Sequence, residues 1–514
     1  MGNLRDQHVS SSMSHFEGLL VHLFALSTPV LFYPWMTDVT RIKTLVGLLI
    51  CGSLLSVHVL RRNCDSRPIR GFRLIFTLYC SWTFLSCLWS VSPIASTAEI
   101  IRLCSSLALM LVIPSLSLLR KPAIHPARSL ALITAVVSAY AVLQSANLDP
   151  LVWSKPTGDG VVSTLGHPNA LGAFLIIGIA AQMIEIAGRV DRISRYFYGF
   201  PLIFLSFIAM GLSMSKGAWM GVACGLFVYW LLGARTPART RVSFLAGLII
   251  IAGITAALLP GSFLSDLVQT NQFRIQTYRQ SLRIYTDDFS PLEKLVGTGA
   301  GTYSHAFDRF RDPSYLVRFK HAANLEHAHS EPIEILLETG IIGLGLFSCF
   351  ICFVIRFAWR NRSEFSVRVW TSASMGLVFH NLVCVNMRWF VPWTFWILAI
   401  AFIGSSTPQQ KTSTRTQNRT LQLIGLLLLP IWVYGAIRTS RHIQADLIYY
   451  QAKTTFPSGR FKDGAALLDR ATGYYADDLA MQYDRAFAHA QAGHTRKSIE
   501  LYDSILRVQR MSPK

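Results

Sequence analysis

The sequence predicts an all-α polytopic membrane protein with about 12–13 transmembrane helices, one large loop on the outer face and a C-terminal helical tail. The 514 residues are 52% hydrophobic and only 15% charged, and the mean hydropathy is +0.38. Apolar stretches of about 20 residues, long enough to cross a bilayer, recur along the chain. They lie at 18–36, 43–60, 74–91, 101–119, 129–147, 165–187, 197–215, 217–233, 242–260, 333–355, 369–387, 389–405 and 420–437.

The first stretch predicts an uncleaved membrane anchor. The 17 residues before it are polar and carry no small-residue cleavage site, which a removable signal peptide requires.

Basic residues account for the net charge of +20, and their distribution predicts the topology. They gather in alternate loops, whereas residues 92–98 have none and residues 148–164 have only Lys155. Loops rich in Arg and Lys stay in the cytoplasm. We therefore expect a cytoplasmic N-terminus, with the loop 261–330 and the tail after residue 438 on the outer face. This pattern also accounts for the positive charge without a nucleic-acid partner.

The chain divides into a membrane domain, residues 1–437, and a soluble tail, residues 438–514. Residues of the tail recur at an offset of 34, the period of a tetratricopeptide helical hairpin. The aligned pairs are Tyr449 with Tyr483, Ala452 with Ala486, Gly459 with Gly493, Leu467 with Leu501, and Asp469 with Asp503. Two such hairpins are too few to stand alone. The tail therefore docks on the membrane domain, on a partner or on a second copy; an ordinary pair of helical hairpins is the alternative.

A helix is predicted within the long loop 261–330. Ile275, Tyr278, Leu282 and Tyr285 are apolar at helical spacing, and Arg274, Arg279 and Arg283 lie mainly off that stripe. Such a helix lies on the membrane surface, with its basic side chains turned toward a polar cavity or the lipid headgroups. The later segment GTGAG, residues 297–301, follows no predicted strand, so it is a turn and no nucleotide-binding fingerprint.

Two cationic positions on the outer face are candidates for anion binding. Lys216, in SMSKGAW, stands between two apolar spans, where a buried charge costs about 2.5–3.5 kcal/mol at the bilayer centre. It either faces a wet cavity or snorkels to the interface. Arg274, with Arg279 close by, offers guanidinium groups that bind phosphate oxygens in pairs. The alternative for these arginines is contact with lipid headgroups.

The segment HAHSEPIEILLETG, residues 327–340, places ionisable side chains at the mouth of an apolar helix. Pro332 is typical of a first helical turn, and a histidine just before it, His329, feels the positive end of the helix. That potential favours neutral imidazole, the form that accepts a proton. Glu334 and Glu338 are four residues apart on one face, where they can orient a histidine or pair with Lys or Arg.

Two further features belong to this segment. Glycines at 340, 343 and 345 allow a neighbouring helix to approach closely. A metal site built from His321, His327, His329 and Glu331 is an alternative use of the histidines, but these residues lack a recognised spacing motif. We therefore expect neither a metal nor a cofactor.

At these residues the chain resembles the O-antigen ligase and polymerase superfamily, which includes the bacterial protein O-oligosaccharyltransferases. AHSEPIEILLETGIIG, residues 328–343, is similar to the family signature that ends its large periplasmic loop. SMSKGAW, GHPNALGAFL at 166–175 and RIQTYRQSL followed by VGTGAGTY are similar to further family segments. Two residues depart from the pattern: Lys216 replaces an arginine, and Ser330 stands where the family often has asparagine.

The resemblance implies a glycosyltransferase of the bacterial inner membrane, with its active site and C-terminus in the periplasm. The donor is a glycan on undecaprenyl diphosphate, and the acceptor is a hydroxyl of a lipid, a glycan or a protein. His329 accepts the hydroxyl proton or orients the acceptor. Arg274, Lys216 and Arg279 bind the diphosphate, and Glu338, Glu331 and Asn169 support the site. The tail is a candidate docking module for an envelope protein.

Three acceptors remain open at this stage: lipid A-core oligosaccharide, a growing repeat-unit polymer, and a protein. A membrane transporter of polysaccharide precursors is a second class, but transporters tend to have two similar halves, and the sequence shows no such repeat. A membrane scaffold that recruits partners through its tail is a third class, and it would not need His329 beside Arg274.

Overall fold

The computed structural model describes residues 2–60, 71–116, 125–151, 160–188, 199–233, 261–310, 312, 315, 325–405, 415–476 and 478–510. Within these ranges every regular element is a helix, so the predicted all-α class is confirmed there. The predicted span 242–260, His321 and many of the basic loop residues lie outside the described residues.

Each predicted span other than 242–260 coincides with a helix. Among the described residues, six helices are long and apolar enough to cross a membrane, and three shorter apolar helices accompany them. The six are α2 (Thr40–Leu60), α3 (Phe72–Ser86) with its 3-10 extension, α4 (Pro93–Val112), α5 (Ala127–Ser145), α6 (Pro168–Gly188) and α15 (Glu331–Arg360). The shorter ones are α8 (Phe200–Leu212), α9 (Lys216–Leu232) and α17 (Phe390–Ser405). Helices α1 (Gly2–Val30), α16 (Phe365–His380) and α18 (Arg415–Thr455) cover the remaining predicted spans.

The bundle has a core rich in aromatic side chains. Trp370 of α16 and Trp393 and Trp396 of α17 are fully buried, and the rings of the last two lie 5.1 Å apart. Because aromatic rings bury large apolar areas, these residues fix how α15, α16 and α17 pack. All three helices border the candidate site.

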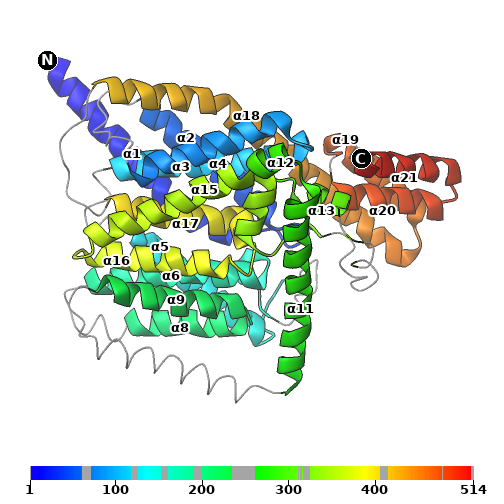
Figure 1. The fold of residues 1–514 in the computed structure, drawn as a ribbon, viewed down its shortest axis with the longest axis horizontal. Coiled ribbons are helices and arrows are strands. Elements are labelled where there is room, and N and C mark those ends of the chain that lie inside the picture. Colours follow the sequence, from blue (N-terminus) through cyan, green and yellow to red (C-terminus); the bar gives the residue numbers. More distant parts are fainter. Residues whose placement is uncertain are drawn as a thin grey trace.

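The elements of the long loop gather at one end of the bundle, and the chain begins at the opposite end (Figure 1). They are α11 (Gly261–Arg283), a π-turn (Ile284–Asp288), α12 (Pro291–Val296) and α13 (Tyr303–Phe310). Helix α11 runs steeply across the direction of the bundle helices (Figure 1). The helical tail lies at this same end, as the predicted topology requires of two segments on one face.

The apolar positions predicted for α11 do not all face one way, because Tyr278 and Tyr285 are partly buried and the other two are exposed. Ile275 and Leu282 are exposed, 46% and 44%, whereas Thr277 and Ser281 are fully buried. Their hydroxyls pair with the hydroxyls of Tyr315 and Tyr303, at 2.8 Å in both cases. Hydroxyl groups with partners are cheap to bury, so the small polar positions turn inward instead.

Helix α15 is broken at Gly340, whose φ of +67° lies in the left-handed region that favours glycine. A Cβ there would lie 2.1 Å from the Leu295 carbonyl oxygen of α12. The predicted close approach therefore holds at Gly340, while Gly345 faces open space.

The break leaves carbonyl groups without helical partners, and the GTGAG turn supplies them. Thr298 and Gly299 donate their N–H groups to the carbonyls of Leu337 and Glu338, at 3.1 and 2.8 Å. The Trp82 indole donates to the Thr339 carbonyl at 3.0 Å. These bonds fix the first half of α15, residues 331–339, as a short rigid segment.

The tail forms two helical hairpins. The second half of α18 pairs with α19 (Phe461–Tyr474), and α20 (Leu479–Gln491) pairs with α21 (Thr495–Arg510). Helices α19 and α21 begin 34 residues apart, and Gly459 and Gly493, aligned at that period, both have positive φ. The assignment to the tetratricopeptide class stays a prediction.

The tail docks on the membrane domain, one of the three possibilities left open by the sequence. Arg41, at the start of α2, lies 3.2 Å from Asp446 of α18 and 3.2 Å from Asp478, which caps α20. Arg438 of α18 donates to the Tyr475 hydroxyl at 2.9 Å and to the Ile94 carbonyl at 3.3 Å. The tail is therefore held beside the end of the bundle that carries α11.

Candidate functional site

The site is built around the first half of α15. Pro332 lies in its first turn, as predicted, and the Glu331 N–H donates to the carbonyl of Asn381, in the turn after α16, at 2.9 Å. This bond ties the start of α15 to the end of α16. The short loop before α15 is thereby brought against the segment that connects α16 to α17.

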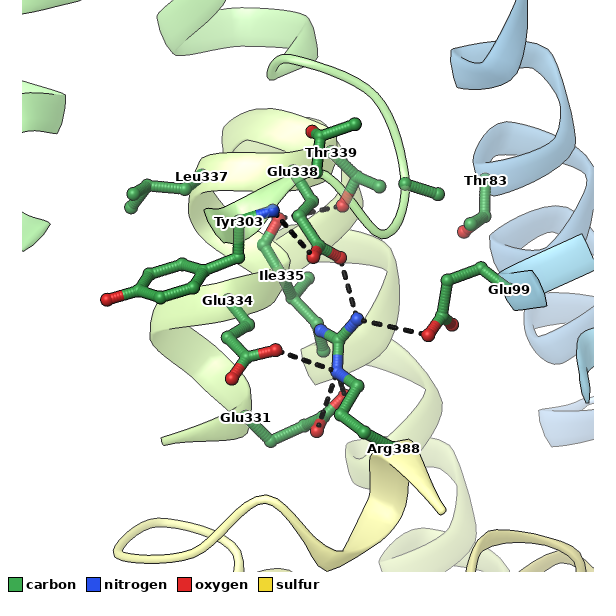
Figure 2. Close-up of polar contacts among 12 residues, drawn as sticks. Thr83, Glu99, Tyr303, Glu331, Glu334, Ile335, Leu337, Glu338, Thr339 and Arg388 are labelled. Atoms are coloured by element: carbon green, nitrogen blue, oxygen red, sulfur yellow. Dashed lines mark hydrogen bonds and ion pairs between the residues drawn. The ribbon is translucent and has the colours of Figure 1, made fainter. Parts of the chain in front are cut away.

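Three buried carboxylates, Glu331, Glu334 and Glu338, and the partly buried Glu99 form a carboxylate cluster that surrounds the guanidinium of Arg388 (Figure 2). The Arg388 Nε lies 3.1 Å from oxygens of Glu331 and Glu334. Its Nη1 lies 2.7 Å from Glu338 and 3.6 Å from Glu99. Glu338 also accepts a hydrogen bond from the Tyr303 N–H at 3.2 Å. Glu334 and Glu338 therefore pair with a basic residue, one of the two uses that the sequence left open, and that residue is Arg388.

A second buried arginine completes the cluster. Arg102 of α4 donates to Glu99 at 3.0 Å and to the Met387 carbonyl at 2.6 Å. Its guanidinium lies over the Trp393 ring at 4.2 Å. Charge in a low-dielectric interior is tolerated only where it is paired, so the two arginines and four carboxylates act as one unit.

Arg388, Arg102 and Glu99 were missed by the sequence reasoning. The signal for Arg388 was present, because it follows the predicted span 369–387 and so falls in an outer loop. A basic residue there is as unexpected under the positive-inside rule as Lys216. The partners of Arg388, in contrast, come from α4 and α15, and only the fold brings them together.

The two histidines of the segment have opposite electrostatic environments. Glu334 lies 3.3 Å from the His327 ring and accepts the Ala328 N–H at 2.8 Å. Burial opposes a charge on His327, but Glu334 outweighs it, and the pKa of His327 is raised. Burial and then Arg274 lower the pKa of His329 to about 4. His329 is therefore neutral at pH 7, in agreement with the sequence prediction, although the main causes are burial and Arg274.

Helix α11 holds His329 in an uncommon backbone conformation. The φ of His329 is +57°, in the left-handed region, and its carbonyl accepts the Tyr278 hydroxyl at 2.8 Å. The ring of Phe273 meets the His329 ring edge to face at 6.1 Å. Non-glycine residues with positive φ are uncommon and persist where the surroundings hold them.

Arg274 also lies on α11, and it is close to His329, which lies in the loop before α15. Its guanidinium donates to the Val383 carbonyl at 2.9 Å. After burial, the charge of Arg274 is the next largest cause that lowers the pKa of His329. The proposed base and the proposed donor arginine are thus brought together, beside the turn that follows α16.

Lys216 and Asn169 lie at the starts of two neighbouring helices. Lys216 is the exposed first residue of α9. The next residue, Gly217, is so close to His380 that an added Cβ would lie 2.5 Å from the His380 ring and 3.5 Å from the Cys384 sulfur. Asn169, at the start of α6, accepts a hydrogen bond from the Ser215 hydroxyl at 2.8 Å. The start of α9 therefore borders the turn that contacts Arg274, and the start of α6 is bound to the start of α9.

Arg279 does not share this environment. It is exposed on α11, on the face that carries Ile275 and Leu282, and the partly buried face carries Arg274 and Tyr278. The side chain of Arg279 therefore points away from the group formed by Arg274 and His329.

The described residues contain no group of three or more His, Cys, Asp or Glu side chains arranged to hold a metal ion. His321, part of the alternative metal site, lies outside them. The carboxylates of the cluster are instead engaged by arginine, His327 and backbone N–H groups.

A comparison with known families gives a match that includes part of the site. The model of the O-antigen ligase family matches residues 201–348, a segment that contains Lys216, Arg274, His329, Glu331 and Glu338. No curated protein matches the chain. The match over residues 201–348 supports the resemblance to the O-antigen ligase superfamily.

Proposed function

We propose that this protein is an O-antigen ligase-like glycosyltransferase that moves a glycan from undecaprenyl diphosphate to an acceptor hydroxyl at the periplasmic face of the inner membrane. The observation that carries the proposal is that Arg274 lies close enough to His329 to lower its pKa, inside the segment that matches the family. A proton acceptor beside a phosphate-binding cation is what transfer from a lipid diphosphate requires.

The reaction breaks the bond between the anomeric carbon of the first sugar and the diphosphate oxygen. The acceptor oxygen attacks that carbon, and His329 takes the hydroxyl proton. The diphosphate leaves with its charge held by Arg274 and Lys216, and Arg279 attracts the anion from the exposed face of α11. Because the diphosphate is already a good leaving group, the scheme needs no metal or cofactor.

The carboxylate cluster supports the site in this scheme. Glu331 and Glu338 hold Arg388, which fixes the first half of α15, and Asn169 fixes the start of α9 through Ser215. None of these groups needs to touch the substrate.

The donor site can be tested by exchanging its two kinds of cation. We expect Arg274→Lys to lose most transfer activity, because an ammonium cannot bind two phosphate oxygens as the guanidinium fork does. We expect Lys216→Arg to transfer as fast as wild type or faster, since it introduces that fork. The assay is transfer by purified protein from glycan-linked undecaprenyl diphosphate extracted from the source bacterium, at matched protein levels. Normal transfer by Arg274→Ala would rule out the diphosphate role of Arg274.

Polysaccharide polymerase and protein O-oligosaccharyltransferase are alternatives that share the donor chemistry. The docked helical tail favours an acceptor or an envelope partner that binds beside the site, which suits a protein acceptor. Surface glycans of a deletion strain separate the cases. Full-length chains left on the lipid carrier indicate a ligase, single repeat units indicate a polymerase, and loss of glycan from one protein indicates a protein acceptor. Normal glycans in all three pools would contradict the proposed function.

The proposed orientation places α11, His329 and the tail in the periplasm. We expect a reporter that is active only in the periplasm to be active when fused after Lys514, because the Arg-rich loops alternate and the predicted number of spans is odd. A matched fusion within residues 61–70 is the control and is expected to be silent. Activity of a cytoplasmic reporter at Lys514 would reverse the orientation.

A further inference from the structure

Tyr278 makes the contact that holds the backbone of His329. Its hydroxyl lies 2.8 Å from the His329 carbonyl oxygen, directly at the residue whose φ is +57°. A left-handed conformation of a non-glycine residue persists only where neighbouring contacts hold it. The hydrogen bond from Tyr278 is therefore placed where it controls the direction of the His329 side chain.

The rest of the segment is fixed from the other side. Glu334 accepts the Ala328 N–H at 2.8 Å and contacts His327, and the Glu331 N–H binds the Asn381 carbonyl. These contacts anchor the residues on both sides of His329 to α15 and to the end of α16. The carbonyl of His329 itself is bound by α11.

Arg274 and Tyr278 are four residues apart on α11 and lie on the same face. Arg274 is itself tied to the Val383 carbonyl at 2.9 Å. One helix thus carries both the cation for the donor diphosphate and the hydroxyl that holds the base. Burial raises the pKa of Tyr278 to about 12, so its hydroxyl keeps the proton that it donates.

We propose that Tyr278 is a positioning residue for the transfer reaction. By binding the His329 carbonyl, it fixes the imidazole relative to Arg274, so that the proton acceptor and the donor diphosphate are held on one rigid frame. This inference rests on the proposed function. Proton transfer requires the base within hydrogen-bond reach of the acceptor hydroxyl, and small displacements of a catalytic group reduce the rate strongly.

The test removes one oxygen atom. We expect Tyr278→Phe to lower kcat on the order of tenfold, the effect of one hydrogen bond. The KM for glycan-linked undecaprenyl diphosphate and the melting temperature should stay at the wild-type values, because Arg274 and the packing of the ring are unchanged. Tyr285→Phe is the matched control. This tyrosine lies in the π-turn that follows α11, and its hydroxyl donates to the carbonyl of Lys294 in α12 at 3.1 Å. It should behave as wild type.

A double-mutant cycle separates positioning from a general structural role. If Tyr278 acts through His329, adding Tyr278→Phe to His329→Ala costs no further activity. Wild-type kcat for Tyr278→Phe, or a second full loss in the double variant, would overturn the inference. Full activity of His329→Ala would instead contradict the proposed base, and with it the mechanism on which the inference rests, so the two failures are distinguishable.

Discussion

Replacing Arg388 by methionine is expected to prevent most of the protein from accumulating in folded form. The Arg388 side chain is 5% exposed, and its guanidinium is shared by Glu331, Glu334 and Glu338, which are buried with it. Removing one partner of a buried ion pair leaves uncompensated charge and costs about 3–5 kcal/mol. Most proteins are stable by only about 5–15 kcal/mol, so one such loss consumes much of the total. Yield and melting temperature in detergent measure the effect.

Two variants make this prediction specific to charge. Arg496→Met removes an arginine whose side chain is 95% exposed and whose partner is Glu500, so its melting temperature should stay near wild type. Adding Glu331→Gln and Glu338→Gln to Arg388→Met should recover part of the lost stability, because these changes remove two of the stranded charges. A melting temperature of Arg388→Met equal to wild type would show that the cluster does not stabilise the fold.

The positions of the apolar helices were predictable because a stretch that can cross a membrane is recognised by its length and composition alone. The described helices coincide with the predicted stretches. The break in α15 was not predictable, although its glycine stands out in the sequence. Gly340 ends a helical segment only because α12 and the GTGAG turn arrive to pair with Leu337 and Glu338. These partners are distant in sequence, and no local pattern reports them.

The buried face of α11 was not predictable for a related reason. Hydropathy favours burying Ile275 and Leu282, and the structure buries Thr277 and Ser281 instead. Each hydroxyl has a tyrosine partner from another element, and that pairing removes the cost of burial. The same rotation turns Arg274 toward His329 and leaves Arg279 exposed, so two arginines that look equivalent in the sequence have different environments.

The ionisable residues of the segment 327–340 were easier to predict than the contacts that hold them in place. Charged residues at the mouth of an apolar helix are costly, and this cost alone singles out His329, Glu334 and Glu338 in the sequence. Which carboxylate contacts which partner depends on how the helices are placed in the fold. Glu334 holds His327 and Arg388, and His329 is held by α11.

Replacing His329 by alanine is expected to lower the transfer rate by about 10²–10⁴-fold, the usual contribution of a general base. Expression and membrane insertion should be unchanged, because the residue lies in a loop and is only partly buried. His327→Ala is the matched control, two residues away and bound to Glu334. It should cost much less, and equal effects of the two changes would point to a shared structural role. Transfer by His329→Ala at the wild-type rate would remove His329 from the mechanism.

The pH dependence provides a second and independent test of His329. Its pKa is about 4 in the free protein because burial and Arg274 disfavour the charged form. Only neutral imidazole accepts a proton, so activity should be lost as the pH falls through the pKa. A diphosphate bound at Arg274 offsets that positive charge, and we expect it to raise the pKa of His329. This makes the imidazole a stronger base once the donor is present.

The pH profiles of kcat/KM and kcat report the free protein and the donor complex separately. The profile of kcat/KM reports the free enzyme, so its acid limb should lie near pH 4, whereas the profile of kcat reports the complex and should have its limb at higher pH. In Arg274→Lys the cation remains, but it binds the diphosphate less tightly. The acid limbs of the kcat/KM and kcat profiles should therefore lie closer together in pH than in the wild-type protein. Coincident acid limbs in the wild-type protein would mean that the donor diphosphate does not bind beside His329, and the assignment of Arg274 would fail with it.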